Sequence, residues 1–215
     1  MSSVAGHTDS GHVDDETIAR AAEVIRGGGV VAFPTDTFYG LGADPFNEGA
    51  VRAVFAAKVR PAESPVPVLL GEPGDLRKVA EEPPSGATDL AAALWPGALT
   101  LVLTAVDELP DVVSAGAGTV GVRVPDHPVP REIARLLGGS ITGTSANLSG
   151  EQSLKTSDQV RVAFGDRLDF IVEGVCGEHA AASTVVDFSV SPPLVRRHGA
   201  ISIDTLRNIC LDIVG

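Results

Sequence analysis

Short apolar runs alternate along this chain with segments whose apolar residues recur at helical spacing. The apolar residues of 18–25 follow an acidic start, which predicts a first helix that ends at Gly27. Val30–Phe33 is then a continuous apolar run, typical of a strand buried on both faces. A second helix follows, which Asn47 can cap and Pro61 prevents from continuing. The N-terminal part of the chain therefore predicts a helix, a buried strand and a second helix.

The same alternation continues to the C-terminus. We expect further strands at 66–70, 99–104, 119–124, 140–144, 170–173, 184–188 and 194–197, and further helices at 75–80, 85–94, 128–137, 157–164 and 204–209. Pro67 suggests either an edge position for its strand or an interrupted ladder, and Ser85 is placed to cap its helix. Strands that alternate with helices predict an α/β layered fold, with antiparallel pairing among the closely spaced last strands.

Composition sets the class of protein and its domain organisation. With 215 residues, 44% hydrophobic and 20% charged, the chain is an ordinary globular sequence. Residues 1–13 are polar and lack periodicity, so we expect a flexible tail followed by a single domain over 14–215. Cys176 and Cys210 have no metal or disulfide spacing, and no apolar run reaches the roughly 18–20 residues that span a bilayer. We therefore expect a cytoplasmic protein with reduced thiols and no membrane association.

Polar side chains gather where the first predicted strand ends. Thr35, Asp36, Thr37 and Tyr39 follow that strand, and the nearby Gly40 and Gly42 are free to take positive φ. A second polar turn, at 145–147, follows another predicted strand. Because ligand sites in open α/β sheets gather at strand ends, these turns are candidates for one ligand site.

Each of these residues also has a purely structural interpretation. Thr35 and Thr37 can bond local backbone in a turn, and Ser145 and Asn147 can cap a helix or stabilise a loop. Pattern alone leaves these alternatives open.

The basic residues differ in how far the pattern decides their role. Lys58 and Arg60 end a predicted helix, where pattern alone favours a solvent-facing pair that complements the helix dipole. Arg123 stands inside an apolar strand pattern, so it needs a carboxylate or phosphate partner, either structural or bound. Arg196 and Arg197 alternate across one strand, so at most one of them faces a common site.

Several segments together resemble one known family. The segments PTDTFYGLG, KVRP, LWPGALTLVL, VGVRVPDHP, TSANLSG, STVVDF and RRHGAIS resemble motifs of the Sua5/YrdC/YwlC family and follow in that family's order over about residues 15–205. The resemblance implies a YrdC-like fold, a twisted mixed β-sheet flanked by helices with a concave substrate-binding face. It also implies synthesis of threonylcarbamoyladenylate for the tRNA modification t6A, without a covalent protein nucleophile.

The resemblance further implies substrates and site residues. The substrates are ATP with Mg²⁺, L-threonine and bicarbonate, and a downstream tRNA threonylcarbamoyltransferase is the implied partner. By motif, the ATP-binding residues are Lys58, Arg60, Thr119, Asn147 and Arg197, the threonine-binding residues are Thr35, Arg123, Ser145 and Ser183, and Thr37 and Tyr39 line the site. Lys58 and Arg60 are the implied catalytic residues, and no protein side chain is implied as a metal ligand. We expect the two polar turns, the strand with Thr119 and Arg123, Ser183 and Arg197 to line one concave face.

The sequence departs from the family pattern at several positions. Members often read KGRP followed by a basic residue, whereas this chain has Val59 within the motif and Ala62 and Glu63 after it. Ala182 also stands where an acidic residue often precedes STVV. One phosphate-binding cation is therefore missing, and Glu63 adds a negative charge, which predicts weaker ATP affinity or a different loop path. The extent of the similarity corresponds to the short form of the family, without an additional C-terminal domain.

Two other functions are compatible with the resemblance. One is an RNA-binding or ribosome-associated module, and the other is a carbamoyl-adenylate-forming relative that acts on another acceptor. The formal net charge of −12 argues against a protein that coats phosphate backbones, since nonspecific nucleic-acid affinity comes from Lys and Arg. We therefore expect weak or no direct binding to tRNA.

Overall fold

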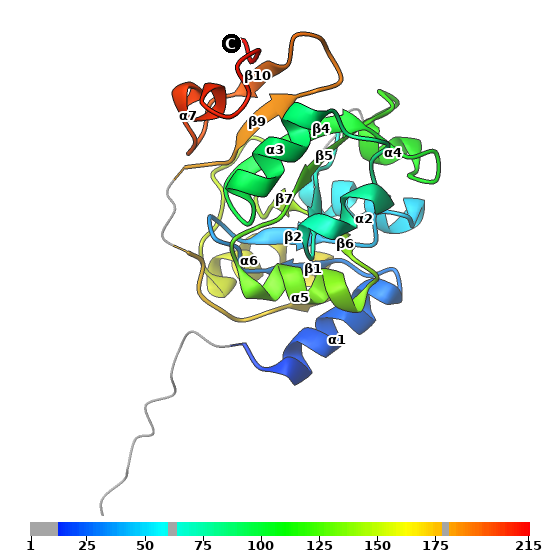
Figure 1. Ribbon diagram of the computed structural model, residues 1–215. Helices are drawn as coiled ribbons and strands as arrows, with labels where there is room; N and C mark the ends of the chain where they lie inside the picture. The colour runs from blue at the N-terminus through cyan, green and yellow to red at the C-terminus, as the bar shows by residue number, and fades with distance from the viewer. Residues whose placement is uncertain (1–12, 60–63, 178–180) are drawn as a thin grey trace, which may run out of the picture.

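Two β-sheets and a set of surrounding helices make up the computed structural model, which describes residues 13–59, 64–177 and 181–215 (Figure 1). The helical elements are α1 (Asp15–Arg26), α2 (Glu48–Lys58), η1 (Pro73–Lys78), α3 (Ser85–Leu94), α4 (Asp111–Ser114), α5 (Pro128–Leu136), α6 (Ser157–Phe164), η2 (Gly165–Arg167) and α7 (Ile203–Arg207). The strands are β1 (Val31–Phe33), β2 (Gly40–Gly42), β3 (Val68–Leu70), β4 (Leu99–Thr104), β5 (Thr119–Arg123), β6 (Ser140–Thr142), β7 (Thr144–Ser145), β8 (Phe170–Ile171), β9 (Thr184–Asp187) and β10 (Leu194–Arg197).

The sheets mix parallel and antiparallel pairs. The four-stranded sheet has the order β7-β2-β1-β8, and the six-stranded sheet has the order β10-β9-β4-β5-β3-β6. Pairing is parallel in β1–β8, β3–β5 and β4–β9 and antiparallel in the other pairs. The predicted α/β fold with a mixed sheet is confirmed, including the antiparallel pair β9–β10.

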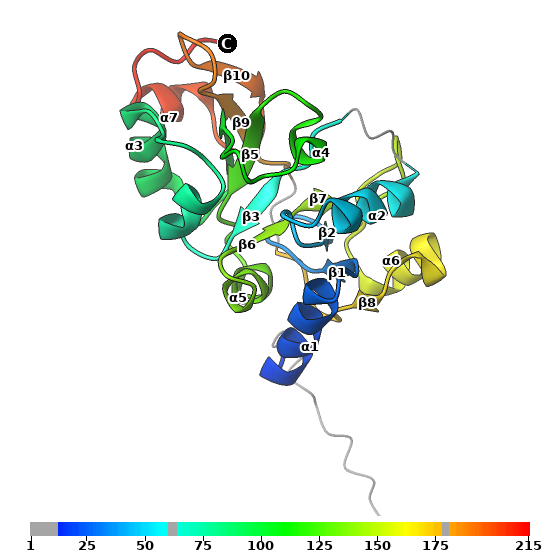
Figure 2. The ribbon, with the colours of Figure 1, turned by 90° about the vertical axis from the view of Figure 1, so that its right-hand side faces the viewer.

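The six-stranded sheet is apolar on one face. Successive side chains of a strand point to opposite faces, and Leu99, Leu101 and Leu103 of β4 are all buried in one core with Leu90 of α3. Trp95 joins that core and donates a hydrogen bond of 2.8 Å from its indole nitrogen to the carbonyl oxygen of Leu99. Figure 2 shows α3 on this side of the sheet, with β1, β2 and α2 on the other side. The second face is therefore turned toward the four-stranded sheet.

The four-stranded sheet is covered on both faces. Val31 and Phe33 of β1 pack in a core with Ile25 of α1 and Ile133 of α5. The alternate residue Ala32 packs in a second core with helices α2 and α6. The prediction that this strand is buried on both faces is confirmed, and it fixes the position of the polar turn that follows β1.

The N-terminal boundary of the fold lies earlier than expected. Val13, which we placed in the flexible tail, is buried with an exposed fraction of 8% in the core that contains α1. Asp14 then caps α1 by accepting a hydrogen bond of 2.7 Å from the backbone nitrogen of Thr17. Residues 1–12 lie outside the described residues, so the rest of the predicted tail stays a prediction. In the described ranges, no helix is long and apolar enough to cross a membrane.

Gly40 and Gly42 do not have the role that the turn pattern suggested. They form strand β2, and neither takes a positive φ. A Cβ on Gly42 would lie 2.5 Å from Cε1 of the Phe33 ring, and one on Gly40 would lie 3.0 Å from Cε2 of the same ring. Glycine is required here because an aromatic ring packs directly on the backbone, which sequence alone does not reveal.

Three further expectations were wrong. Of the two alternatives for Pro67, the edge position is wrong, because β3 lies between β5 and β6 and begins one residue after the proline. Ser85 is the first residue of α3 rather than its cap, and Pro84 occupies the cap position without a side-chain hydrogen bond. The single strand predicted at 140–144 is divided at Gly143, with β6 in one sheet and β7 in the other.

Val59 adopts a backbone conformation that suits glycine. It ends α2 with φ 52° and ψ 42°, in the left-handed region, and its exposed fraction is 67%. Left-handed backbone costs an L-residue about 1–2 kcal/mol, and a β-branched side chain fits it poorly. This is the position at which the family motif KGRP has glycine, so the departure in this chain carries a strain that the motif avoids.

We expect Val59→Gly to stabilise the fold by about 0.5–1 kcal/mol, after allowance for the greater unfolded-state entropy of glycine. Val162→Gly is the matched control, because Val162 is 88% exposed inside α6. That control should lose a few tenths of a kcal/mol, because valine is already a weaker helix former than alanine and glycine is weaker still. Urea denaturation measures both changes, and equal destabilisation of the two variants would show that Val59 is not strained.

Candidate functional site

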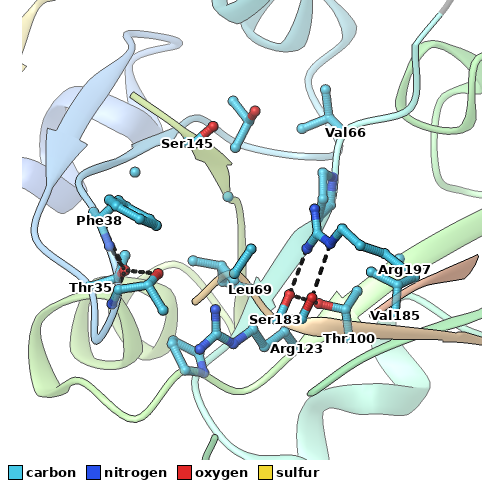
Figure 3. A pocket seen from close by; sticks show the side chains of 18 of the residues that line it. Thr35, Phe38, Val66, Leu69, Thr100, Arg123, Ser145, Ser183, Val185 and Arg197 are labelled. Carbon is cyan, nitrogen blue, oxygen red and sulfur yellow. Dashed lines mark hydrogen bonds between the residues drawn. The ribbon is translucent and has the colours of Figure 1, made fainter. Parts of the chain in front are cut away.

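A cavity of about 460 Å³ lies between the two sheets (Figure 3). Its polar lining consists of Thr35, Thr37, Tyr39, Thr100, Thr119, Arg123, Thr144, Ser145, Ser153, Ser183 and Arg197. Apolar walls are contributed by Phe38, Val66, Pro67, Leu69, Val102 and Val185, among others. A partly apolar cavity with a few converging polar groups is the usual form of a small-molecule site.

Strand alternation explains the wall formed by the six-stranded sheet. Thr100 and Val102 of β4 line the cavity, whereas their neighbours Leu99 and Leu101 are in the core behind. Thr119, Gly121 and Arg123 of β5 follow the same alternation, as do Ser183 and Val185 at the start of β9. The face of this sheet that α3 leaves uncovered is therefore the floor of the cavity.

The opposite wall begins with the turn after β1. The Thr35 hydroxyl donates a hydrogen bond of 2.7 Å to the carbonyl oxygen of Phe38 and accepts one of 3.1 Å from the backbone nitrogen of Thr37. The Thr37 hydroxyl lies 3.2 Å from the Thr35 hydroxyl. Because its proton is used inside the turn, Thr35 acts here as a turn former, and Thr37 presents its hydroxyl beside it.

Tyr39 ties this turn to the segment that follows β8. Its phenolic oxygen lies 3.1 Å from the carbonyl oxygen of Val172 and 2.9 Å from that of Gly174, and it accepts a hydrogen bond from the backbone nitrogen of Gly174. Burial raises the pKa of Tyr39, so the phenol keeps the proton that it donates. Tyr39 therefore stabilises the cavity wall through these hydrogen bonds and also belongs to the cavity lining.

Arg123 has the buried partner that its position required. One guanidinium nitrogen, Nη2, forms an ion pair with the carboxylate of Asp36, and Nε donates a hydrogen bond of 2.7 Å to the carbonyl oxygen of Gly97. Both side chains are buried, with exposed fractions of 9% and 3%. Burial lowers the pKa of Arg123, and Asp36 counteracts that effect. Within the described residues Nη1 makes no hydrogen bond, so one donor group of this cavity-lining residue is left for a ligand.

Arg197, on the last strand β10, forms two hydrogen bonds with Ser183. Its Nε donates a hydrogen bond of 3.0 Å to the Ser183 carbonyl oxygen, and its Nη2 donates one of 2.9 Å to the Ser183 hydroxyl. Burial lowers the pKa of Arg197. Its neighbour Arg196 points away and bonds Asp187 at 2.8 Å, so only one of the two arginines faces the cavity, as predicted.

Lys58 is buried rather than solvent-facing. Its exposed fraction is 3%, and its ammonium group donates hydrogen bonds to the carbonyl oxygens of Ser145 and Asn147, the latter at 2.9 Å. The interpretation of Lys58 as an exposed helix end is therefore wrong. The lysine binds the polar turn at 145–147 from behind and holds Ser145 at the cavity wall.

Asn147 is committed to the same turn. Its side-chain nitrogen donates to the carbonyl oxygens of Leu148 and Glu151, both at 2.9 Å, and its side-chain oxygen accepts from the Ser145 hydroxyl at 2.6 Å. Asn147 is not part of the cavity lining. Its local bonds support the loop-stabilising alternative, and its role toward ATP stays a prediction.

The structure brings most of the predicted residues together. Those that line the cavity are Thr35, Thr37, Tyr39, Thr119, Arg123, Ser145, Ser183 and Arg197. Lys58 and Asn147 bond to Ser145 from outside the lining, whereas Arg60, Ala62 and Glu63 lie outside the described residues. The proximity of distant segments is confirmed, and the individual binding roles stay predictions.

Two site residues escaped the sequence reasoning. Asp36 was noted only as a carboxylate in the turn, although the need of Arg123 for a partner was the signal that could have found it. Thr100 gave no signal, because a threonine that alternates with leucines is ordinary in a strand with one buried face.

The charged side chains of the cavity lining are both cationic, although Asp36 neutralises one of them. Arg123 and Arg197 are the charged residues in its described lining, and no Asp or Glu is among the lining residues. This contrasts with the net charge of −12 for the whole sequence. A low-dielectric site with two cations and several hydroxyls favours ligands with anionic oxygens. Among the residues that the structure describes, no group of three or more His, Cys, Asp or Glu could hold a metal ion.

Comparison with known proteins found a matching family model and several similar sequences. A family model for Sua5, YciO and YrdC proteins, described as "Telomere recombination", matches residues 23–199. The chain is 36% identical over 201 residues to a protein of Pyrococcus abyssi named threonylcarbamoyl-AMP synthase, with 94% of this chain and 59% of that protein covered. It is 36% identical over 192 residues to a Mycobacterium tuberculosis protein named putative threonylcarbamoyl-AMP synthase, with 89% and 88% covered.

A solved structure agrees with these sequence matches. The crystal structure of P. abyssi Sua5 complexed with L-threonine superposes with a TM-score of 0.89 at 35% identity, with 94% of this chain and 60% of that chain covered. The chain thus spans about three fifths of the archaeal relative's length. Because the family model covers most of the sequence and the fold agrees throughout, the chain belongs to the Sua5/YciO/YrdC family.

Proposed function

We propose that this protein is an L-threonylcarbamoyladenylate synthase, which forms threonylcarbamoyl-AMP and pyrophosphate from L-threonine, bicarbonate and ATP. The observation that supports it most is a cavity lined by Arg123 and Arg197 without a carboxylate, because all three substrates carry anionic oxygens. The names of the relatives, and the L-threonine bound to one of them, support the same reaction.

The reaction suits a site that positions and neutralises charge. The amine of threonine and bicarbonate give N-carboxythreonine and water. The new carboxylate attacks the α-phosphorus of ATP, and the bond to the leaving pyrophosphate breaks, which leaves a mixed anhydride. Such transfer depends mainly on positioning and on electrostatic stabilisation by fixed donors. Fixed hydroxyls and guanidinium groups are what the cavity offers.

We also propose substrate roles for the two arginines and their neighbours. Arg123 would bind the threonine carboxylate through its remaining donors, and Arg197 would lie on the nucleotide side with Thr119. Mg²⁺ would enter with ATP, held by phosphate oxygens and water, because the described lining has no carboxylate to bind it. Lys58 would contribute positive charge and hold the turn with Ser145, and Arg60 keeps its proposed catalytic role.

The proposal is tested with the full-length chain, ATP, Mg²⁺, bicarbonate and each amino acid in turn. We expect pyrophosphate release that requires both L-threonine and bicarbonate, and a product with the mass of threonylcarbamoyl-AMP. Pyrophosphate release that ignores threonine would favour a carbamoyl-adenylate-forming relative with another acceptor. No nucleotide turnover with any amino acid would contradict the proposal.

Arg123→Lys should raise the KM for L-threonine by about tenfold or more, with a smaller effect on the KM for ATP. A lysine has no planar fork, so it cannot bond Gly97, Asp36 and a carboxylate in the same geometry. Arg196→Lys is the matched control, because Arg196 bonds Asp187 away from the cavity. Steady-state kinetics measures both variants, and equal KM values in the two would remove Arg123 from threonine binding.

We also propose that tRNA is handled by the downstream transferase in the cytoplasm, and not by this protein. The sequence has 28 acidic residues and 16 Lys and Arg, and two of those cations are committed to the cavity. Binding to tRNA should therefore be weak at physiological ionic strength. Filter binding across salt concentrations measures it. Tight binding, with log K falling by about 0.7–0.9 per phosphate contact for each decade of salt, would favour an RNA-binding module instead.

A further inference from the structure

Thr100 occupies a central position on the cavity floor that its sequence context did not reveal. It belongs to β4, between β9 and β5, and its exposed fraction is 6%. A Cβ on Gly121 of β5 would lie 3.5 Å from the Thr100 methyl carbon, and the Thr100 hydroxyl lies 2.8 Å from the Ser183 hydroxyl. The methyl group is thus directed toward β5 and the hydroxyl toward β9, as Figure 3 shows for the hydroxyl.

The hydroxyls of Thr100 and Ser183 carry two protons, and the hydrogen bond between them uses only one. A guanidinium can only donate, so the bond of 2.9 Å from Arg197 makes the Ser183 oxygen an acceptor. The bond between the two hydroxyls consumes one hydroxyl proton. In the described residues neither side chain has another acceptor. One O–H donor is therefore left at the cavity surface.

The direction of the hydrogen bonds favours Thr100 as the residue with the remaining donor. A charged donor polarises the Ser183 hydroxyl, which strengthens that hydroxyl as a donor in turn. The favoured chain runs from Arg197 to Ser183, from Ser183 to Thr100, and from Thr100 into the cavity. The opposite arrangement would make the Ser183 oxygen accept twice and would lose this reinforcement.

The sheet register places Thr100 beside Arg123 on the cavity floor. Leu101 pairs with Val122 in the antiparallel ladder of β4 and β5, so the next residues along, Thr100 and Arg123, face the cavity together. Neighbours of this kind have Cβ atoms about 4.5–5.5 Å apart. Thr100 and Arg123 are therefore neighbours in the lining of one cavity.

We propose that Thr100 is a substrate-binding residue, whose hydroxyl donates to the carboxylate oxygen of the amino acid that Arg123 binds. This rests on the proposed function for the identity of the amino acid. Ser183 and Arg197 polarise the Thr100 hydroxyl and hold it in place, so that the three residues act as one unit.

The test compares Thr100→Val, Thr100→Ser and Ser183→Ala with the double variant Thr100→Val/Ser183→Ala. Thr100→Val should raise the KM for L-threonine about five- to tenfold, the effect of one hydrogen bond, with the KM for ATP unchanged. Thr100→Ser should restore most of the loss because it keeps the hydroxyl. The KM of the double variant for L-threonine should be about equal to that of the more impaired single variant. The effects of residues that act as a unit are not additive.

Thr104→Val is the matched control, because Thr104 is an exposed threonine of the same strand outside the cavity lining. It should leave both KM values unchanged. An unchanged KM in Thr100→Val, an equal loss in Thr100→Ser, or losses that multiply in the double variant would each overturn the proposal. A change confined to the KM for ATP would also overturn it. Wild-type protein that forms no adenylate and binds no L-threonine in calorimetry would refute the proposed function itself.

Discussion

The buried ion pair between Asp36 and Arg123 connects the two sheets at the base of the cavity. Asp36 belongs to the turn after β1 of the four-stranded sheet, and Arg123 ends β5 of the six-stranded sheet. Removing one partner of such a pair leaves an uncompensated buried charge, which costs about 3–5 kcal/mol. One oxygen of Asp36, Oδ1, has no hydrogen-bond partner in the described part of the chain, so this carboxylate depends all the more on Arg123. The pair therefore couples the shape of the cavity to the orientation of its main cation.

Close backbone approaches allow the sheets to meet at this point. A Cβ on Gly143, between β6 and β7, would overlap the Leu69 side chain of β3. A Cβ on Gly177 would lie 2.6 Å from the Asp36 carbonyl oxygen, and the Gly177 nitrogen donates to the Thr35 carbonyl oxygen at 2.9 Å. Glycines at these positions let the chain cross from one sheet to the other and brace the polar turn. The approach of the two sheets at the cavity thus depends on glycines, which have no side chain.

Local sequence pattern predicted most helices and strands of the fold. In the site, it could identify single residues but not their partners. Helix α6 and strand β10 have the bounds that periodicity gave, because caps and alternation are local signals. Arg123 could be recognised as needing a partner, since an arginine among apolar strand residues is costly alone. The partner itself was not identified, because Asp36 is 87 positions away in sequence.

The misplaced residues share one physical cause. Gly42 was interpreted as a turn glycine, yet the ring of Phe33 requires it, and Lys58 was interpreted as exposed, yet carbonyl oxygens of the turn at 145–147 bury it. In each case the deciding neighbour comes from another strand or turn. Thr100 is the clearest example, because only the packing of β9 against β4 gives its hydroxyl a partner. Tertiary contacts of this kind leave no periodic trace in the sequence.

A crystal structure of the protein with L-threonine and a non-hydrolysable ATP analogue tests the central claim most directly. We predict that the threonine carboxylate lies between the two sheets, hydrogen-bonded to Arg123, while Asp36 keeps its own bond to that guanidinium. Threonine bound outside this cavity, for example in the groove that Thr17, Arg161 and Phe170 line, or an Arg123 side chain turned away from the ligand, would contradict it.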